Sequence, residues 1–452
     1  MNILEESRNY LFYQHKGTLP NIQKTDGIYM WDQSGKEYID GCSGAVVCNI
    51  GYKNSLIKEA IIHQAQNTFF AYRMHFENEP AIKLAKEMVA HSAPHLKRIF
   101  YVSGGSEAVE TAMKLCRQYF YDRKEGSRHL FIGRVPAYHG CTLGALALTS
   151  YAPLETPFRP LIKTYPKIPA PYCYRCAYNL TYPDCGLACA QALEKTILEQ
   201  GPQNVAGFIA EPIGGASTGA LVPPEGYFDI IQSTCRKYSV MLILDEVMTG
   251  FGRTGKMFAY EHWNVEADIL ALSKGMASGY FPLGAILARD TLVDTVLNSG
   301  GFKHGYTYAG NPMACAVGLQ VFKYIMEHDL CTNAHLMGTR LKDGLEGMAR
   351  KTPIIGQVRG KGLLLAVELV QGPGTKEPFP VDANAGQLLY DIAFEQGLII
   401  YPRRPINGIV GDHVLIAPPL IISAAEVDEI LRRFEAALNL LPMRLTDSKG
   451  KT

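Results

Sequence analysis

Two patterns of apolar and polar positions alternate between Arg98 and Ala288. Short, nearly continuous apolar runs, which are typical of strands buried on both faces of a sheet, are separated by longer stretches with helical spacing. The predicted strands are RIFYV, HLFIG, AGFIAE, VMLILDE, ILALS and PLGAILA. Because strands and helices alternate along the chain, the pattern predicts an α/β fold with a mostly parallel sheet and helices on both of its faces.

The C-terminal part of the chain shows a different pattern. IIGQVRGKGLLLAVELV predicts two paired strands divided by Gly360 and Gly362, and AAEVDEILRRFEAALNLL predicts an amphipathic helix. At 452 residues, the chain is longer than one hydrophobic core usually supports. We therefore expect a large domain over residues 61–325 and a smaller α+β domain that combines residues 1–60 with residues 326–452.

Charged residues stand where three of the predicted strands end. Glu211 and Asp245 end two of the apolar runs, and Lys274 follows ILALS. Ligands of such sheets bind beyond the carboxyl ends of the strands. A buried carboxylate requires a cationic partner, and burial lowers the pKa of a lysine and makes it a usable nucleophile. Considered alone, however, Asp245 could be a helix cap and Lys274 a surface residue.

Two further features follow strands at the same predicted edge. The turn Ser103 to Ser106, followed by helical spacing, presents backbone N–H groups and a positive dipole end that suit a phosphate, although ordinary helix caps look similar. Tyr138 could stack on a flat ligand or pack in the core. A phosphate, a flat ring with a basic nitrogen and an aldehyde that reacts with lysine would together satisfy these residues. Pyridoxal phosphate has all three groups.

The charge balance is nearly even, with 44 lysine and arginine residues against 43 aspartate and glutamate residues. Such a chain offers no net field to nucleic acid or to an acidic membrane. No apolar run approaches the ~20 residues of a membrane span, and MNILEESRNY lacks the features of a signal peptide. We therefore expect a cytoplasmic protein with small-molecule substrates and without nucleic acid or membrane partners.

Four of the eleven cysteines lie close together in CYRCAYNLTYPDCGLAC. Four thiolates can close a tetrahedral zinc site, but the second pair is separated by three residues rather than the commoner two. Free thiols in a surface insertion are the alternative that we favour, so no metal is predicted. The cysteines are Cys173, Cys176, Cys185 and Cys189.

Eight motifs cover nearly the whole chain. In order they are GKEYIDGCSGAVVCNIGY, SGGSEAVETAMKLCR, AYHG, AEPI, LILDEVMTGFGRTG, LSKGMASGYFPLGA, HGYTYAGNPMACA and GDHVLIAPPL. Together they resemble the class III, or ω-amino-acid, aminotransferases, which are pyridoxal-phosphate enzymes of fold type I, and their order is far more specific than any single motif. The resemblance implies a seven-stranded sheet and ping-pong transfer of an amino group from an amine or ω-amino acid to a keto acid such as pyruvate.

The resemblance also implies a role for each matching residue around the cofactor ring. Lys274 would form the Schiff base with the cofactor and then move the substrate proton. Asp245 would pair with the pyridine nitrogen and keep it protonated. Val247 and Tyr138 would pack on the two faces of the ring.

The phosphate contacts implied by the resemblance involve two subunits. Gly105 and Ser106 would bind the phosphate at the helix start. Thr307 would reach the phosphate of the neighbouring subunit. A homodimer, or a dimer of dimers, with active sites at the subunit interface is therefore implied.

The substrate side departs from the family pattern. Members often have Ser-Gly-Leu-Trp where this chain has SGAVV, so Val46 stands in place of an aromatic residue and the pocket would be wider, unless Tyr72 or Trp31 compensates.

Glu211 resembles the acid that pairs with a mobile arginine near the substrate carboxylate. Arg403 and Arg404 are the candidates for that arginine, but they precede Gly411 by a longer loop than is usual.

Two alternatives to transamination stay open at this point. The same cofactor and residues also serve isomerisation and decarboxylation, because the cofactor accepts the electrons in every case and the pocket selects the bond that breaks. A cofactor-binding scaffold without catalysis is the other alternative. It is disfavoured by the presence of both Asp245 and Lys274, since a scaffold requires neither.

Overall fold

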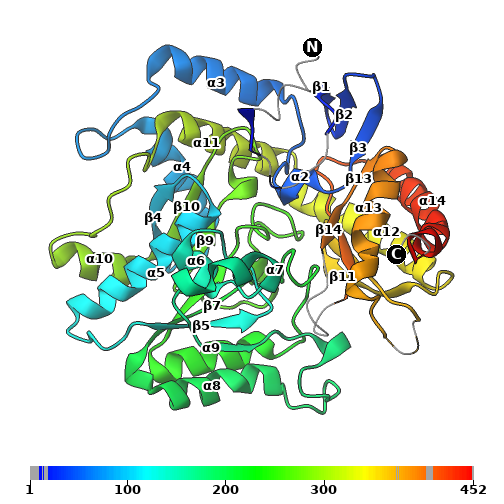
Figure 1. Cartoon of the computed structure of the whole chain (residues 1–452). Helices are drawn as coiled ribbons and strands as arrows, with labels where there is room; N and C mark the ends of the chain where they lie inside the picture. The colour runs from blue at the N-terminus through cyan, green and yellow to red at the C-terminus, as the bar shows by residue number, and fades with distance from the viewer. Residues whose placement is uncertain are drawn as a thin grey trace.

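The computed structural model describes residues 10–12, 14, 19–372, 374, 376–403 and 411–449. A seven-stranded sheet forms its centre (Figure 1). The strand order is β4 (Leu96–Val102), β10 (Gly284–Arg289), β9 (Ile269–Leu272), β8 (Met241–Asp245), β7 (Val205–Ala210), β5 (Leu130–Val135) and β6 (Lys167–Pro169).

All six strands predicted from the apolar runs are present in this sheet, and β6 is an additional edge strand. β10 runs antiparallel to both of its neighbours, whereas the pairs from β9 to β6 are parallel. The mostly parallel sheet is therefore confirmed. The carboxyl ends of the parallel strands share one edge, where ligands bind in sheets of this kind.

Helices cover both faces of the central sheet (Figure 1). Alternate side chains of β8 point to opposite faces of the sheet: Ile243 packs with α5, whereas Leu242 and Leu244 pack with α9. One layer contains α5 (Gly105–Asp122), α6 (Leu143–Leu148) and α10 (Asp290–Asn298). The other layer contains α3 (Ser55–Asn67), α4 (Glu79–Ala90), α8 (Ala188–Gln200), α9 (Tyr227–Tyr238) and α11 (Pro312–Glu327). Two helices of four residues, α2 (Ser43–Val46) and α7 (Ala152–Glu155), lie in connections.

Two four-stranded sheets combine segments from both ends of the chain. The first contains β1 (Ile22–Asp26), β2 (Tyr29–Asp32), β3 (Glu37–Asp40) and β13 (Leu398–Ile399). The second contains β11 (Ile355–Lys361), β12 (Leu364–Leu369), β15 (His413–Ile416) and β14 (Tyr401–Arg403). The helices that pack around them are α12 (Leu330–Ala349), α13 (Ala385–Glu395) and α14 (Ala424–Lys449). Because β13 pairs with β3, the N-terminal and C-terminal segments form one body.

The predicted hairpin is present as β11 and β12, but Gly360 does not divide the two strands. Gly360 pairs with Leu365 inside the hairpin. The chain turns at Gly362, where φ is +54° and a Cβ atom would lie 2.4 Å from the carbonyl carbon of Thr254. The close approach explains why a glycine is required at the turn.

The predicted domain boundaries at residues 60 and 325 fall inside helices α3 and α11, which pack against each other. Helix α3 thus begins in the N-terminal segment and packs with the helices of the central sheet. The division into residues 1–60, 61–325 and 326–452 stays a prediction.

Arg253 connects the N-terminal, central and C-terminal parts of the chain. Its fully buried guanidinium donates hydrogen bonds to Asn49 Oδ1 at 2.8 Å, to Leu363 O at 3.0 Å and to Pro418 O at 2.6 Å. Burial lowers the pKa of Arg253 to about 10. One side chain therefore fixes how three distant segments meet.

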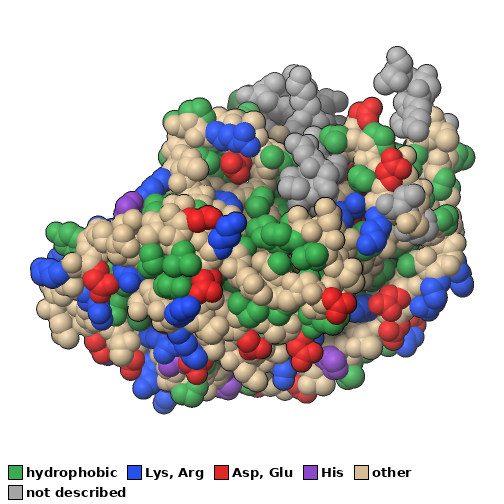
Figure 2. All heavy atoms as spheres, turned by 90° about the horizontal axis from the view of Figure 1, so that it is seen from below, with side chains coloured by type: hydrophobic (Ala, Val, Ile, Leu, Met, Phe, Trp, Pro, Cys, Tyr) green, Lys and Arg blue, Asp and Glu red, His purple; other side chains and the backbone are tan. Residues whose placement is uncertain are grey.

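The surface carries both signs of charge. Figure 2 shows basic and acidic side chains interspersed over the face seen from below, in keeping with the near-even totals of 44 and 43. In the part of the chain that the structure describes, no helix is both long enough and apolar enough to cross a membrane.

Candidate active site

A cavity of about 150 Å³ lies at the carboxyl ends of β5, β7 and β8, beside the start of α5. The residues predicted from strand ends and turns come together around it. Those that line the cavity are Gly105, Ser106, Tyr138, Glu211, Asp245, Val247 and Lys274. Other lining residues include His139, Gly140, Ile213, Ala216 and Met248.

Lys274 follows β9 and begins a short 3₁₀ helix, Lys274–Met276, with φ of +47°. Its conformation is sterically unfavourable for a residue with a side chain, so the surrounding structure must hold it in place. Burial lowers the pKa of the Lys274 ammonium to about 8, the Arg403 charge acts in the same direction, and Asp245 opposes both. A larger fraction of this amine is therefore neutral and nucleophilic near neutral pH than in an exposed lysine.

Asp245 ends β8 and is 4% exposed. Its Oδ2 accepts a hydrogen bond from His139 Nδ1 at 2.7 Å, and its Oδ1 accepts one from the backbone N–H of Val247 at 3.1 Å. Donation through Nδ1 fixes the imidazole relative to the carboxylate. His139 was not predicted as a site residue, although its place beside Tyr138 in AYHG was the available signal.

Glu246, the neighbour of Asp245, faces away from the cavity. It is fully buried, accepts hydrogen bonds from Thr249 Oγ1 and from the backbone N–H of Tyr260, and burial raises its pKa to about 7. Successive side chains on a strand point to opposite faces, so only one of the two acids reaches the cavity.

The start of α5 forms a tight cradle. A Cβ atom on Gly105 would lie 2.8 Å from Val247 Cγ1, and a Cβ atom on Gly140 would lie 2.6 Å from Ser106 Oγ. The backbone N–H of Cys141 donates to Ser106 Oγ at 3.0 Å. The first turn of α5 carries N–H groups without intrahelical acceptors, which is a suitable environment for an anion.

Glu211 lies directly after β7 and is 5% exposed. Its Oε1 accepts a hydrogen bond from Gly215 N at 3.0 Å, and its Oε2 lies 3.8 Å from Arg134 Nη2. Within the described residues, Oε2 has no hydrogen-bond partner, and burial raises the pKa of the carboxyl group. Arg134, on β5, was not predicted because nothing in the sequence links it to Glu211.

The substrate candidates lie at different distances from the cavity. Arg403 ends β14, contacts the rings of Tyr401 and Tyr151 at 4.5 and 5.8 Å, and lowers the pKa of Lys274 through its charge. Arg404 lies outside the described residues. Val46 is buried in a cluster with Ile213 and Ala216 and so backs two lining residues.

The remaining predicted residues lie elsewhere. Thr307 is exposed on the loop before α11. Tyr72, on the loop between α3 and α4, lines two other cavities. Trp31 lies in β2, where its ring is 6.1 Å from that of Tyr29. Neither Tyr72 nor Trp31 therefore lines the cavity beside Lys274, and the role of Val46 in shaping the substrate pocket stays a prediction.

The four clustered cysteines line a separate cavity of about 20 Å³ and are free thiols. Across the described ranges, no group of three or more His, Cys, Asp or Glu side chains is arranged to hold a metal ion.

A nucleophilic amine, a buried carboxylate and an anion-suited helix start around one cavity define a site that fits pyridoxal phosphate. The glycines at positions 105 and 140 leave space that a side chain would fill. The family model of class III aminotransferases matches residues 12–438, and the chain therefore belongs to this family.

Known relatives agree with the family assignment. An uncharacterized aminotransferase of Bacillus subtilis is 41% identical over 92% of this chain and 94% of its own length. The putrescine–pyruvate aminotransferase of Pseudomonas aeruginosa is 34% identical over 91% of this chain and 88% of its own length. The ω-transaminase from Pseudomonas jessenii in complex with PMP superposes with a TM-score of 0.92 at 32% identity and covers 99% of both chains.

The protein is accordingly a pyridoxal-phosphate-dependent aminotransferase of fold type I. It transfers an amino group from an amine to a keto acid. The cofactor and the reaction predicted from the sequence are confirmed.

Proposed function

We propose that the cavity beside Lys274 binds the cofactor and the substrates, and that pyruvate is the amino acceptor. The observation that carries this proposal is that the Lys274 amine and the Asp245–His139 pair line one cavity. When bound there, pyridoxal phosphate supplies an electron sink for the carbon that loses its proton.

Lys274 and Asp245 have complementary roles in this proposal. Lys274 Nζ would hold the cofactor, and as the free amine it would take the proton from the amine-bearing carbon of the donor. Its lowered pKa, about 8, places the neutral form within reach of neutral pH. Asp245, held by His139, would pair with the ring nitrogen and favour its protonated form.

The other lining residues orient the cofactor in our proposal. Tyr138 and Val247, which line the cavity, would pack on its two ring faces. Gly105 and Ser106 at the start of α5 bind the phosphate, because free backbone N–H groups and the helix dipole favour an anion there.

Arg403 is proposed to bind the carboxylate of the keto acid or of an ω-amino acid, with Glu211 as the neighbouring acid. Its position beside the Tyr401 and Tyr151 rings brings a guanidinium close enough to Lys274 for its charge to lower the Lys274 pKa. A guanidinium can bind a carboxylate through two parallel hydrogen bonds.

A donor panel read by alanine formation from pyruvate tests the function. We expect alanine from at least one of putrescine, β-alanine and an aromatic amine without a carboxylate. Arg403→Gln is expected to raise the KM for pyruvate by about 10–100-fold, because a charge-assisted hydrogen bond to the carboxylate is lost. The KM for the aromatic amine is expected to stay unchanged.

Two comparisons complete this panel. Arg340→Gln is the matched control, because Arg340 pairs with Asp428 on the surface at 2.7 Å. Arg404→Gln tests the adjacent candidate. If no donor yields alanine while carbon dioxide or an isomer forms, decarboxylation or isomerisation replaces transamination.

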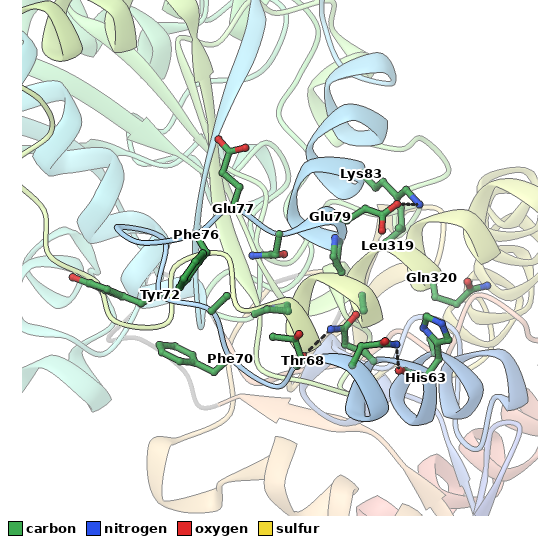
Figure 3. Close-up of a pocket in the computed structure, with 18 of the residues that line it drawn as sticks. His63, Thr68, Phe70, Tyr72, Phe76, Glu77, Glu79, Lys83, Leu319 and Gln320 are labelled. Atoms are coloured by element: carbon green, nitrogen blue, oxygen red, sulfur yellow. Dashed lines mark hydrogen bonds and ion pairs between the residues drawn. The ribbon is translucent and has the colours of Figure 1, made fainter.

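We further propose a homodimer or a dimer of dimers, in which Thr307 reaches the partner's phosphate site. Support comes from large exposed aromatic side chains beside Thr307 and on the loop between α3 and α4, where Tyr308 and Phe76 are 59% and 69% exposed. Figure 3 shows Phe70, Tyr72 and Phe76 among the residues that line a cavity. The volume of this cavity is about 1190 Å³. Sedimentation equilibrium would give at least twice 49.8 kDa if a second copy covers this surface.

A cytoplasmic location is also proposed. All eleven cysteines are free thiols in the structure, as is typical of proteins in a reducing compartment. The location of a fluorescent fusion checks this.

A further inference from the structure

The loop that follows β7, residues 211–221, is held by side chains from the C-terminal sheet. Arg359, on β11, donates from Nη2 to Thr218 O at 2.8 Å and from Nε to Gly219 O at 2.6 Å. His413, on β15, donates from Nε2 to Ala216 O at 2.8 Å. Three carbonyl groups of the loop, those of Ala216, Thr218 and Gly219, therefore accept hydrogen bonds from side chains outside it.

Arg359 is itself held by a buried carboxylate. Its Nη1 lies 2.7 Å from Oε2 of Glu368, which is fully buried on β12. Glu368 also accepts hydrogen bonds from Arg175 Nε at 2.7 Å and from the Tyr172 hydroxyl. Arg175 lies between two of the clustered cysteines, so the cysteine-containing insertion anchors the network.

The fit between the loop and these side chains leaves no spare space. Gly219 has φ of +65°, and a Cβ atom there would lie 2.6 Å from His413 Cδ2 and 2.7 Å from Arg359 Nη2. Gly214 and Leu221 close the loop through paired backbone hydrogen bonds of 2.8 and 3.1 Å. The backbone of the loop is therefore fixed at both its closing pair and its tip.

The fixed loop carries groups to the active-site cavity. Glu211, Ile213 and Ala216 line that cavity, and Gly215 N donates to Glu211 Oε1 at 3.0 Å. Ile213 and Ala216 also pack against Val46. Lys274, Asp245 and His139 are on other segments, so the loop forms one wall of the cavity and not its reactive centre.

We propose that Arg359 is a positioning residue for substrate binding: it sets loop 211–221, and Glu368, anchored by Tyr172 and Arg175, sets Arg359. This rests on the proposed function, in that the cavity is the substrate site. The planar guanidinium is suited to the task because it directs several N–H groups at fixed angles to different acceptors, which a lysine cannot do. A buried ion pair such as Arg359–Glu368 often adds little net stability. The hydrogen bonds of Arg359 to the loop therefore explain the presence of this arginine better than its ion pair does.

The test compares Arg359→Lys with the wild-type holoenzyme. The KM for the amine donor is expected to rise about tenfold, because small displacements of a lining wall weaken substrate positioning. The visible absorbance of the bound cofactor and its pH dependence are expected to stay as in the wild type, because Lys274, Asp245 and His139 are untouched.

Arg128→Lys is the matched control. Arg128 likewise fastens backbone carbonyls, those of Pro202 at 3.1 Å and Val205 at 2.8 Å, and pairs with Glu125 at 2.9 Å, but at the amino end of β7. We expect it to lower Tm as Arg359→Lys does while the KM stays unchanged.

A triple variant separates positioning from stability. Arg359→Met leaves Glu368 buried without its main partner, and Glu368→Leu would in turn leave Arg175 without its carboxylate. Adding both Glu368→Leu and Arg175→Met removes all three charges, so Tm should recover in the triple variant. If Arg359 positions the loop, the KM stays about tenfold raised although Tm has recovered. A KM that returns to the wild-type value together with Tm, or that never changes in Arg359→Lys, overturns the inference. A wild-type protein without transaminase activity would instead contradict the proposed function.

Discussion

Replacing Lys274 with alanine is expected to lower multiple-turnover transamination by about four orders of magnitude, the upper range for loss of a general acid–base group. In the proposed function, this variant loses both the amine that would hold the cofactor and the group that would move the substrate proton. Its visible absorbance should therefore lack the band of the lysine-bound cofactor. Alanine formation from pyruvate and the absorbance spectrum measure the two effects.

Lys167→Ala is a matched control for this experiment. Burial lowers the pKa of Lys167 to about 8, like that of Lys274, but Lys167 Nζ donates to Ala147 O at 2.9 Å on the far side of β5. It should lose stability and keep both the absorbance band and turnover. Full turnover in the Lys274→Ala variant would refute the assignment of Lys274.

The pH dependence of cofactor loading, measured with the wild-type apoprotein, tests the lowered pKa of Lys274. Only the neutral amine attacks the aldehyde, so the rate of cofactor loading should rise with pH and level off above about 8, where Lys274 has lost its proton. An exposed lysine would give a rise that continues to about pH 10.

Replacing Asp245 with asparagine is expected to reduce kcat/KM by about 100–1000-fold, the usual cost of removing a preorganised charge at a reacting centre. Asparagine has nearly the same shape and can still bond to His139, but it lacks the negative charge that, in the proposed function, would favour a protonated ring nitrogen. Cofactor absorbance should persist because Lys274 is intact. Steady-state kinetics with the best donor measure the loss.

Asp268→Asn provides the comparison for Asp245→Asn. Asp268 is a largely buried carboxylate at the opposite end of the same strands, where it accepts from Leu242 N at 2.8 Å and pairs with Arg289 at 2.7 Å. It should affect Tm and leave kcat/KM near the wild-type value. Equal kinetics for the two variants would show that the charge of Asp245 has no special role.

Six strands of the central sheet could be predicted from the sequence, because strands that are buried on both faces consist of continuous apolar runs. β6 was missed, since its three residues, Lys167–Pro169, give neither a run nor an alternation. Gly360 was placed at the hairpin turn, yet the clash at Gly362 decides where the chain turns. Sequence patterns report burial and periodicity but not which of two nearby glycines meets another backbone.

The site residues likewise include some that the sequence predicts and others that only the fold brings together. Lys274, Asp245 and Glu211 could be found because charge at the end of a buried strand is unusual. His139, Arg134 and the buried pair formed by Arg359 and Glu368 were missed, because each interaction joins residues that only the fold brings together. The expectations for Val46 and Thr307 came from family resemblance and not from a physical pattern.

The contacts of Arg253 have a consequence for biosynthesis. Its acceptors include Asn49 near the start of the chain and Pro418 near its end. A nascent chain that has not yet released Pro418 from the ribosome would have to keep this guanidinium hydrated, since burying it without acceptors is costly. The two outer segments therefore cannot close onto the centre until Pro418 has left the ribosome, and a chain that stops before Pro418 is expected to be a substrate for proteases rather than a smaller enzyme.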